Sequence, residues 1–140
     1  MAATKLLNFT FPASPEHLCT VRTKLRDTLG SARFPQETID CIVLAIGEAC
    51  MNIIQHAYCD GDCGDIVLEI VRQDSCLVFR LTDFARHKSR QEEMQSRPLD
   101  EIRPGGLGCH IINEIMDEVE LLDCGNRQGN ILQMKKELTS

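Results

Sequence analysis

Two polar residues stand one helical turn apart in an otherwise apolar segment of the sequence. The segment IGEACMNIIQHAY, residues 46–58, contains Glu48 and Asn52, and Glu48 is the only residue with a formal charge from Cys41 to Cys59. Side chains four residues apart on a helix project side by side. A carboxylate can take the proton of a hydroxyl nucleophile, and a carboxamide oxygen can bind Mg²⁺. The pair therefore fits proton abstraction beside a metal ion, or simply a Glu hydrogen-bonded to an Asn on a helix surface.

Two further stretches carry chemistry at the ends of expected elements. Asp83 ends the apolar run CLVFRLTD, where its carboxylate can accept the exocyclic amine of adenine or simply favour a turn. The stretch RPGGLG, Arg103 to Gly108, leads into a helix. Its glycines let backbone N–H groups approach phosphate oxygens, and a helix N-terminus adds partial positive charge. The stretch is neither a P-loop nor a Rossmann fingerprint, and the alternative interpretation is a flexible loop before a helix.

The composition is that of a globular protein without a generic basic surface. The chain has 140 residues, of which 43% are hydrophobic and 26% charged, and its net charge is −6. Nucleic acids and anionic membranes need a basic patch, so this charge argues against both. No apolar run approaches the roughly 18 to 20 residues of a membrane span, and the start lacks the apolar region of a signal peptide. We therefore expect a cytoplasmic protein of one domain, residues 1–140, with no direct contact to nucleic acid or membrane.

Eight cysteines are many for this length, and none forms a CxxC pair. In a reducing compartment we expect them to be small buried hydrophobes or exposed thiols. Cys50 and Cys76 fall at apolar positions of periodic segments, which agrees with that interpretation. The alternative is a metal site from His56, Cys59 and Cys63, although this spacing matches no common zinc motif.

The apolar periodicity predicts an α+β fold in which short turns join pairs of strands. Because of these turns, we expect a mixed, mostly antiparallel sheet with helices on one face, a two-layer α/β sandwich. Ser14 is expected to cap the first helix and Gly30 to end it. Residues 84–104 have no apolar period, which is typical of a lid or binding loop. The expected strands are 5–11, 65–72, 76–83, 118–123 and 130–137, and the expected helices are 15–30, 34–58 and 105–116.

One face of the second expected helix has an unusual composition. Glu48 and Asn52 lie there, opposite the apolar stripe, together with Leu44, Ala45 and Gln55. A solvated helix face would be rich in Lys and Glu, and this face is not. We therefore expect another layer of protein, or a ligand, to cover it.

Taken in order, these segments resemble the nucleotide-binding motifs of the GHKL ATPases, which share the Bergerat ATP-binding fold. GEACMNIIQHAY resembles the N-box, LTDFARH the first glycine box, and RPGGLGCHIINEIMDEVE the second. The resemblance is closest to the anti-sigma factor serine/threonine kinases, through HAY after the N-box and MDEV after the second glycine box. It covers nearly the whole chain, since QGNILQMKKEL resembles the last strand of the same domain.

The resemblance implies a role for each motif residue. Glu48 would be the general base for a Ser or Thr hydroxyl, Asn52 would hold Mg²⁺, and Asp83 would bind the adenine of ATP. Residues 84–108 would form the ATP lid. The residues of this lid implied to contact the nucleotide are Ala85, Arg103, Gly105, Gly106, Leu107 and Gly108.

Two positions depart from the family's pattern. The first glycine box usually reads Asp-x-Gly-x-Gly or Asp-x-Gly-x-Pro, whereas residues 83–87 read DFARH. Ala85 would adopt positive φ less easily than glycine. The family's late Gly-Thr is Gly129-Asn130, where the carboxamide can replace the hydroxyl as a polar contact. These changes bear on nucleotide affinity more than on the fold.

The resemblance implies an ATP-dependent serine/threonine kinase that acts in partner switching. The kinase would phosphorylate a STAS-domain anti-sigma factor antagonist and bind a sigma factor. The resemblance also implies a homodimer. One alternative is a regulator of the same fold that binds partners or nucleotide without turnover. Another is a metal or redox sensor that uses the cysteines.

Overall fold

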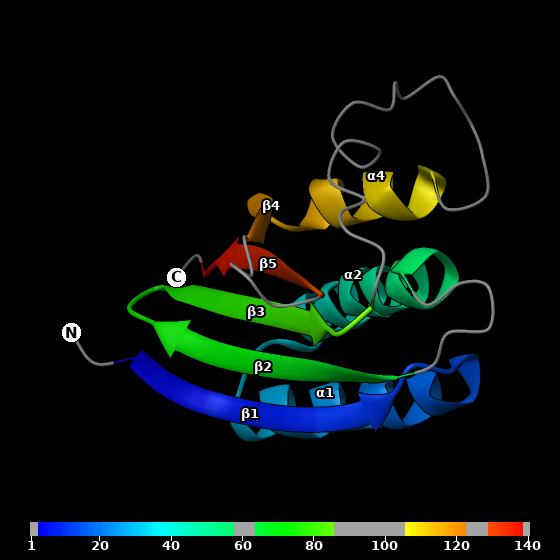
Figure 1. The fold of residues 1–140 in the computed structure, drawn as a ribbon. Helices are drawn as coiled ribbons and strands as arrows, with labels where there is room; N and C mark the ends of the chain where they lie inside the picture. Colours follow the sequence, from blue (N-terminus) through cyan, green and yellow to red (C-terminus); the bar gives the residue numbers. More distant parts are fainter. Residues whose placement is uncertain (1–2, 58–63, 86–105, 123–128, 139–140) are drawn as a thin grey trace.

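A computed structural model describes residues 3–57, 64–85, 106–122 and 129–138 of the chain. The elements follow the order predicted from the sequence (Figure 1). A 3₁₀ turn, Pro15–His17, precedes the first α-helix, and a π-helical turn, Ile53–Ala57, continues the second. The α-helices and strands are β1 (Ala3–Pro12), α1 (Leu18–Ser31), α2 (Gln36–Asn52), β2 (Asp65–Gln73), β3 (Cys76–Asp83), α4 (Gly106–Ile115), β4 (Glu118–Leu122) and β5 (Asn130–Glu137).

The strands form one sheet in the order β1-β2-β3-β5-β4. Every pairing in the described sheet is antiparallel, in line with the mostly antiparallel sheet expected from the short turns. The central strand β3 pairs with β2 through the Asp74-Ser75 turn, and on its other side with the distant β5. The register of β3 and β5 sets Asp83 directly opposite Asn130. The last residue of one strand therefore meets the first residue of the other.

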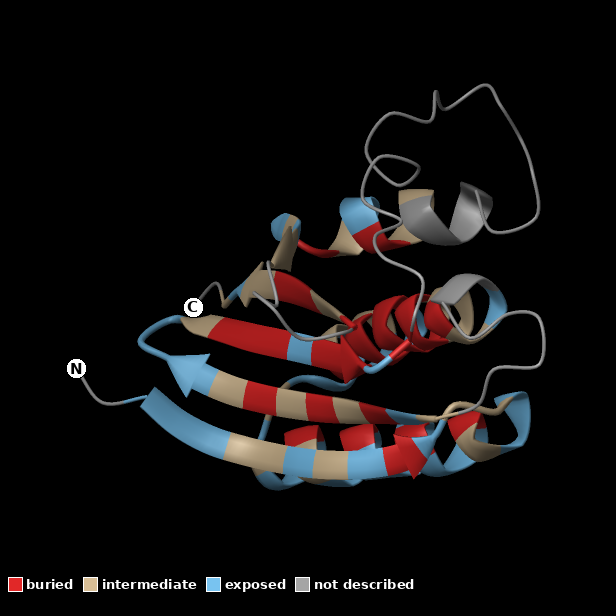
Figure 2. Ribbon diagram, viewed as in Figure 1, coloured by how far each residue is buried: buried red, intermediate tan, exposed pale blue. Residues whose placement is uncertain are grey.

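The helices lie on one face of the sheet, so the fold is the predicted two-layer α+β sandwich (Figure 1). Alternate residues of β2 are buried, because successive side chains of a strand point to opposite faces. The buried positions of sheet and helices face each other (Figure 2). Burying such aliphatic side chains stabilises the fold by about 1.5–3 kcal/mol each. The largest fully buried side chains include Leu25, Leu29, Ile42, Ile46, Ile66, Leu68, Ile70, Leu77, Phe79, Leu81 and Met134.

The first helix ends differently from the prediction. Gly30 lies inside α1, and the residue with left-handed backbone is Arg33, with φ of 65°. The Arg33 N–H donates to the Gly30 carbonyl, and the Phe34 N–H donates to the Leu29 carbonyl at 3.2 Å. These two bonds make a Schellman ending, in which the left-handed position is usually glycine. Gly30 stands three residues too early for that position, so the prediction that it ends the helix is wrong.

The start of the first helix also differs from the prediction that Ser14 caps it. Ser14 has the extended backbone of an N-cap, but its side chain makes no cap hydrogen bond. Its hydroxyl donates to Oε1 of Glu16 instead, at 2.6 Å. A 3₁₀ turn with Pro15 at its first position then leads into α1. The predicted serine cap is therefore present in backbone conformation only.

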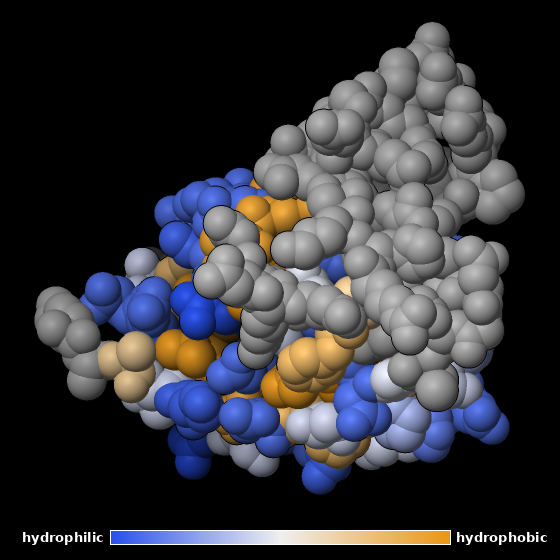
Figure 3. Space-filling view, viewed as in Figure 1, coloured by the Kyte–Doolittle hydropathy of each residue, from blue (hydrophilic) through white to orange (hydrophobic). Residues whose placement is uncertain are grey.

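The sheet face that points away from the helices carries a polar network between apolar side chains. Nε of Arg80 donates to Oε1 of Gln133 at 2.7 Å, and Nε2 of Gln133 donates to Oε1 of Glu120 at 3.0 Å. The network therefore crosses β3, β5 and β4. On this face, hydrophilic side chains interrupt the apolar surface over the strands (Figure 3).

Candidate active site

The predicted site residues come from segments that end at one end of the molecule. The C-terminal end of α2, the end of β3, the start of β5 and the N-terminal end of α4 all lie there (Figure 1). Helix α4 packs along α2. Ile53, Ala85 and Ile112, from three of these segments, belong to one buried cluster. Segments far apart in sequence thus assemble around the residues of the N-box and the first glycine box.

Asp83 is the most buried polar residue of this region. Its exposed fraction is 2%. Its Oδ1 atom accepts hydrogen bonds from the backbone N–H of Ala85 at 3.1 Å and from Nδ2 of Asn130 at 3.2 Å. Burial raises the pKa of the Asp83 carboxyl, and the N–H donors of Ala85 and Asn130 oppose that rise in pKa. The protein therefore holds a carboxyl group in a nearly dry place by surrounding it with donors.

The two positions that depart from the family's pattern, Ala85 and Asn130, both donate a hydrogen bond to Asp83. The expected polar contact of Asn130 is present, because its carboxamide donates to Asp83. Ala85 does not need the positive φ that the family's glycine would allow, since the only non-glycine residues with positive φ in the described chain are Arg33 and Asp74. Ala85 is 2% exposed and packs in the core. The alanine is thus accommodated as a core residue that also donates its N–H.

Glu48 and Asn52 lie one turn apart on α2, and both are half-buried. Glu48 lines a groove of about 430 Å³ between α1 and α2. Within the described residues, Glu48 makes no hydrogen bond or ion pair. The sequence analysis predicts that another layer of protein or a ligand covers the face of α2 that carries Glu48. The protein covers this face only in part, because Ala45 is buried while Leu44 is 49% exposed. Helices α1 and α4 both pack against α2, and the strip that includes Leu44 stays open.

The groove beside Glu48 contains residues that the sequence analysis missed. Gly47 has no side chain, and a Cβ atom there would lie 3.7 Å from Nε of Arg22. The Arg22 guanidinium therefore lies over α2 next to Glu48, and Arg22 and Glu48 both line the groove. A glycine inside a helical pattern signals such close approach. Gly47, directly before Glu48, was the available signal.

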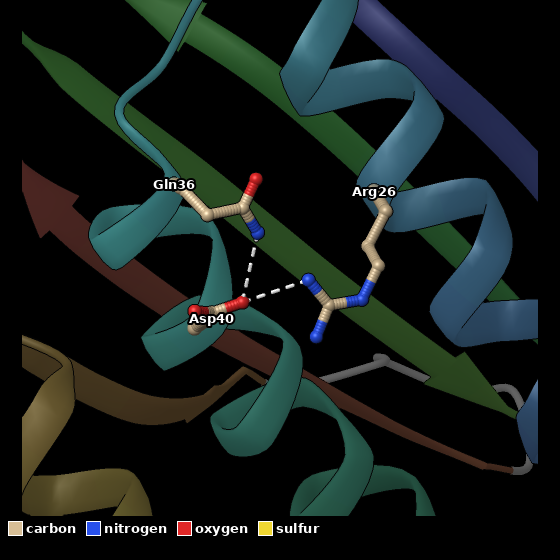
Figure 4. A network of polar contacts seen from close by, with 3 residues as sticks. All are labelled: Arg26, Gln36 and Asp40. Atoms are coloured by element: carbon tan, nitrogen blue, oxygen red, sulfur yellow. Dashed lines mark hydrogen bonds and ion pairs between the residues drawn. The ribbon is translucent and has the colours of Figure 1, made fainter.

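A polar network closes the far end of this groove. Nη1 of Arg26 on α1 contacts Oδ1 of Asp40 on α2 at 2.7 Å, and Nε2 of Gln36 donates to the same oxygen at 2.9 Å (Figure 4). These donors lower the pKa of the Asp40 carboxyl, with the Arg26 hydrogen bond as the main cause. The network connects α1 to α2 through Arg26. The other arginine that lines the groove is Arg22.

The donor chemistry around Asn52 fits a magnesium ion. Its carboxamide oxygen is a hard oxygen ligand of the kind that Mg²⁺ prefers. Mg²⁺ usually takes one or two protein ligands and fills the remaining positions with water and phosphate oxygens. In the described part of the chain, no group of three or more His, Cys, Asp or Glu is placed to hold a metal ion. Asn52 would supply one protein ligand to such an ion, with water and phosphate oxygens in the remaining positions.

Several predicted positions lie outside the described residues. They include Arg103, Gly105 and most of the lid, and also Cys59 and Cys63 of the alternative metal site. The backbone of Gly106, Leu107 and Gly108 forms the first turn of α4, as predicted for the helix that follows the glycine stretch.

A larger groove, of about 580 Å³, lies at the opposite end of the sheet. It is lined by the α1–α2 connection, the β2–β3 turn and the end of β5, and it contains no predicted site residue.

The described helices include none that is long and apolar enough to cross a membrane.

Comparisons with known proteins identify the family of this chain. Residues 11–136 match the family model of the histidine kinase-like ATPase domain. Serine-protein kinase RsbW of Bacillus cereus is 31% identical over 121 residues, which cover 79% of this chain and 73% of the relative. This chain belongs to that kinase family. RsbW of Oceanobacillus iheyensis is 28% identical over 132 residues, which cover 89% of this chain and 82% of the relative.

A solved structure shares the fold of this family member. The crystal structure of the RsbU and RsbW domains of a Mycobacterium tuberculosis protein superposes with a TM-score of 0.66 and 19% sequence identity. The match covers 99% of this chain and 32% of that chain. Family membership confirms the resemblance found in the N-box and the two glycine boxes, and with it the histidine kinase-like ATPase fold.

Proposed function

We propose that this kinase transfers the γ-phosphoryl group of ATP to a serine or threonine of a STAS-domain anti-sigma factor antagonist, with Glu48 as general base. The observation that carries the proposal is the state of Glu48. It is a half-buried carboxylate without an ion pair or hydrogen bond in the described residues, and it lines an open groove one turn from Asn52. A base needs this access to a hydroxyl group of another protein.

The chain's residues would divide the reaction between them. Glu48 takes the proton of the substrate hydroxyl while the hydroxyl oxygen forms a bond to the γ-phosphorus of ATP. The bond between the γ-phosphorus and the β–γ bridging oxygen breaks, and its electron pair leaves with ADP. Asp83 accepts the exocyclic amine of adenine, and Asn52 holds Mg²⁺ through its carboxamide oxygen. Magnesium, when bound, neutralises charge on the phosphates. The N-terminus of α4 offers backbone N–H groups to phosphate oxygens.

The groove between α1 and α2 suits the approach of a protein substrate. Leu44, 49% exposed, and Met51 provide apolar surface there, and Arg22 adds positive charge beside Glu48. We further propose that the protein binds a sigma factor when the antagonist is phosphorylated, and that it works in the cytoplasm as a homodimer. The ten-residue strand β1, at the edge of the described sheet, and the adjacent α1 are the candidate dimer surface.

The replacement Glu48→Gln tests the assignment of the base. The glutamine side chain keeps the size and polarity of the glutamate but cannot take a proton. We expect phosphoryl transfer from labelled ATP to a STAS-domain partner to fall by a factor of about 10² or more, while calorimetric ATP affinity changes little. Glu37→Gln, at the start of the same helix, is the matched control and should keep normal transfer. Normal phosphorylation by Glu48→Gln would rule out the assignment.

A further inference from the structure

Three consecutive residues of β5 hold the C-terminal end of α4. Nζ of Lys136 donates to the carbonyl of Ile115, the last residue of the helix, at 3.0 Å. The backbone N–H of Asp117 donates to the Lys135 carbonyl at 2.8 Å, and Oδ2 of Asp117 accepts the backbone N–H of Glu137 at 2.6 Å. We call these three contacts the β5 clamp. Two of them depend on a side chain, that of Lys136 or that of Asp117.

The ammonium group of Lys136 suits the end of a helix. The last carbonyls of a helix have no partner within it, and partial negative charge gathers there. A lysine can donate to these carbonyls and is attracted by that charge. Among the described residues Lys136 makes no ion pair, so its printed polar contact is the one with Ile115. Since the two residues are 21 positions apart, the contact anchors α4 to the sheet.

The β5 clamp fixes the position of α4 along its own axis. The helix packs along α2 through buried side chains such as Ile112. Apolar packing has no preferred direction, whereas the hydrogen bonds of the clamp do. The helix runs from the end of the molecule that carries Asp83 to β4 and β5 (Figure 1). A helix of ten residues is a stiff rod of about 15 Å, so a shift at one end is passed to the other.

We propose that Lys136 and Asp117 are positioning residues for the triphosphate, because they set the place of the N-terminal turn of α4. This inference rests on the proposed contact between that turn, residues 106–108, and the phosphates. The backbone N–H groups must lie within hydrogen-bond distance of phosphate oxygens, so a displacement of about 1 Å weakens the contact. The proposed base contact at Asp83 comes from β3 and does not involve α4.

ATP and adenosine are suitable probes, because they share the base and the ribose and differ in the phosphates. Calorimetric affinities, direct for ATP and by competition for adenosine, give a ratio for each variant. Lys136→Met keeps the apolar part of the side chain and removes the donor and the charge. We expect the ratio to fall by about fivefold or more, while adenosine affinity stays the same. Lys136→Arg, which keeps the donor and the charge, should restore most of the ratio.

Asp117→Ala tests the second side chain of the β5 clamp. It removes the acceptor for the Glu137 N–H, and it should also lower the ratio of ATP to adenosine affinity. Asp117 and Lys136 both line the larger groove at this end of the sheet. Neither substitution therefore opens a cavity in the core.

Lys135→Met is the matched control. It removes the same charge from the same strand, but successive side chains of a strand point to opposite faces. Lys135 takes part in the clamp through its backbone carbonyl, which the substitution keeps. Its affinity ratio should equal that of the unmodified protein. An equal fall in Lys135→Met and Lys136→Met would mean that lost positive charge alone weakens phosphate binding, and it would overturn the inference.

Two further results would contradict the positioning role. An unchanged ratio in Lys136→Met would overturn the inference, as would a loss of ATP and adenosine affinity by the same factor. If Lys136→Met does not fold, Asp117→Ala decides, and an unchanged ratio there overturns the inference. Equal affinities of the unmodified protein for ATP and adenosine would instead contradict the proposed function, because the phosphates would then add nothing to binding.

Discussion

Gly129 lies against the backbone of Asp83, and a Cβ atom at position 129 would overlap the Asp83 carbonyl oxygen. Gly129 also has a φ of 109°, a conformation that side-chain-bearing residues rarely adopt. The close approach brings the start of β5 onto the end of β3. This close approach of the two strands allows the Asn130 carboxamide to reach the Asp83 carboxylate.

Gly129→Ala should therefore destabilise the protein. The new methyl group meets backbone atoms that cannot rotate away, and the positive φ adds strain. We expect a loss of at least about 2 kcal/mol in the free energy of unfolding, measured by urea denaturation. Gly30→Ala is the control, because a Cβ there meets nothing within 4 Å and the residue is helical. That variant should gain about 0.5–1 kcal/mol, and equal effects of the two alanines would contradict the structure.

Arg33→Gly should stabilise the end of α1. Arg33 occupies the left-handed position of the helix ending with φ of 65°, where a residue with a Cβ atom costs about 1–2 kcal/mol. Glycine relieves this cost but loses more entropy on folding, so we expect a net gain of about 0.5–1 kcal/mol. Arg33→Ala removes the same charge without relieving the backbone, and its midpoint in urea should not rise. A less stable Arg33→Gly would mean that the arginine side chain outweighs the strain.

The stability of the protein should depend on pH through Asp83. Its pKa is raised above the ordinary value of 3.8, chiefly by burial. The folded state therefore binds the proton more tightly than the unfolded state. This contribution is fully present below the unfolded pKa and is lost as the pH rises through the folded pKa. Asp83→Asn lacks this titration, so its stability relative to the unmodified protein should increase from acidic to neutral pH. Urea midpoints at several pH values would measure it, and a parallel pair of curves would contradict the raised pKa.

Thiol labelling should distinguish two described cysteines. Cys50 is fully buried, and burial raises the pKa of its thiol to about 12. Cys19 is exposed on α1. Because the thiolate is the reactive form, iodoacetamide at neutral pH should modify Cys19 and leave Cys50 intact until urea unfolds the protein. Peptide mass spectrometry assigns the modified residue. Rapid modification of Cys50 in the folded protein would contradict its position in the core and strengthen the redox alternative.

Much of the fold could be predicted from local patterns. The period of apolar residues predicts each described helix and strand, because burial on one face repeats every 3.6 residues in helices and every two in strands. The motifs around Glu48, Asn52 and Asp83 predict a nucleotide site because, taken in order, they resemble the nucleotide-binding motifs of the GHKL ATPases. The ends of α1 were harder to predict, since glycine and serine allow a cap without requiring one.

Contacts between distant segments needed the tertiary structure. Asn130 is 47 residues from Asp83, and only the antiparallel register of β3 and β5 brings its carboxamide to Oδ1. The packing of α1 on α2 likewise brings Arg22 over Gly47, beside Glu48. Periodicity reports which side of an element is buried but contains no information about its neighbour. The residue types in the chain therefore indicate the chemistry of the site, whereas strand register and helix packing decide which atoms hold those residues in place.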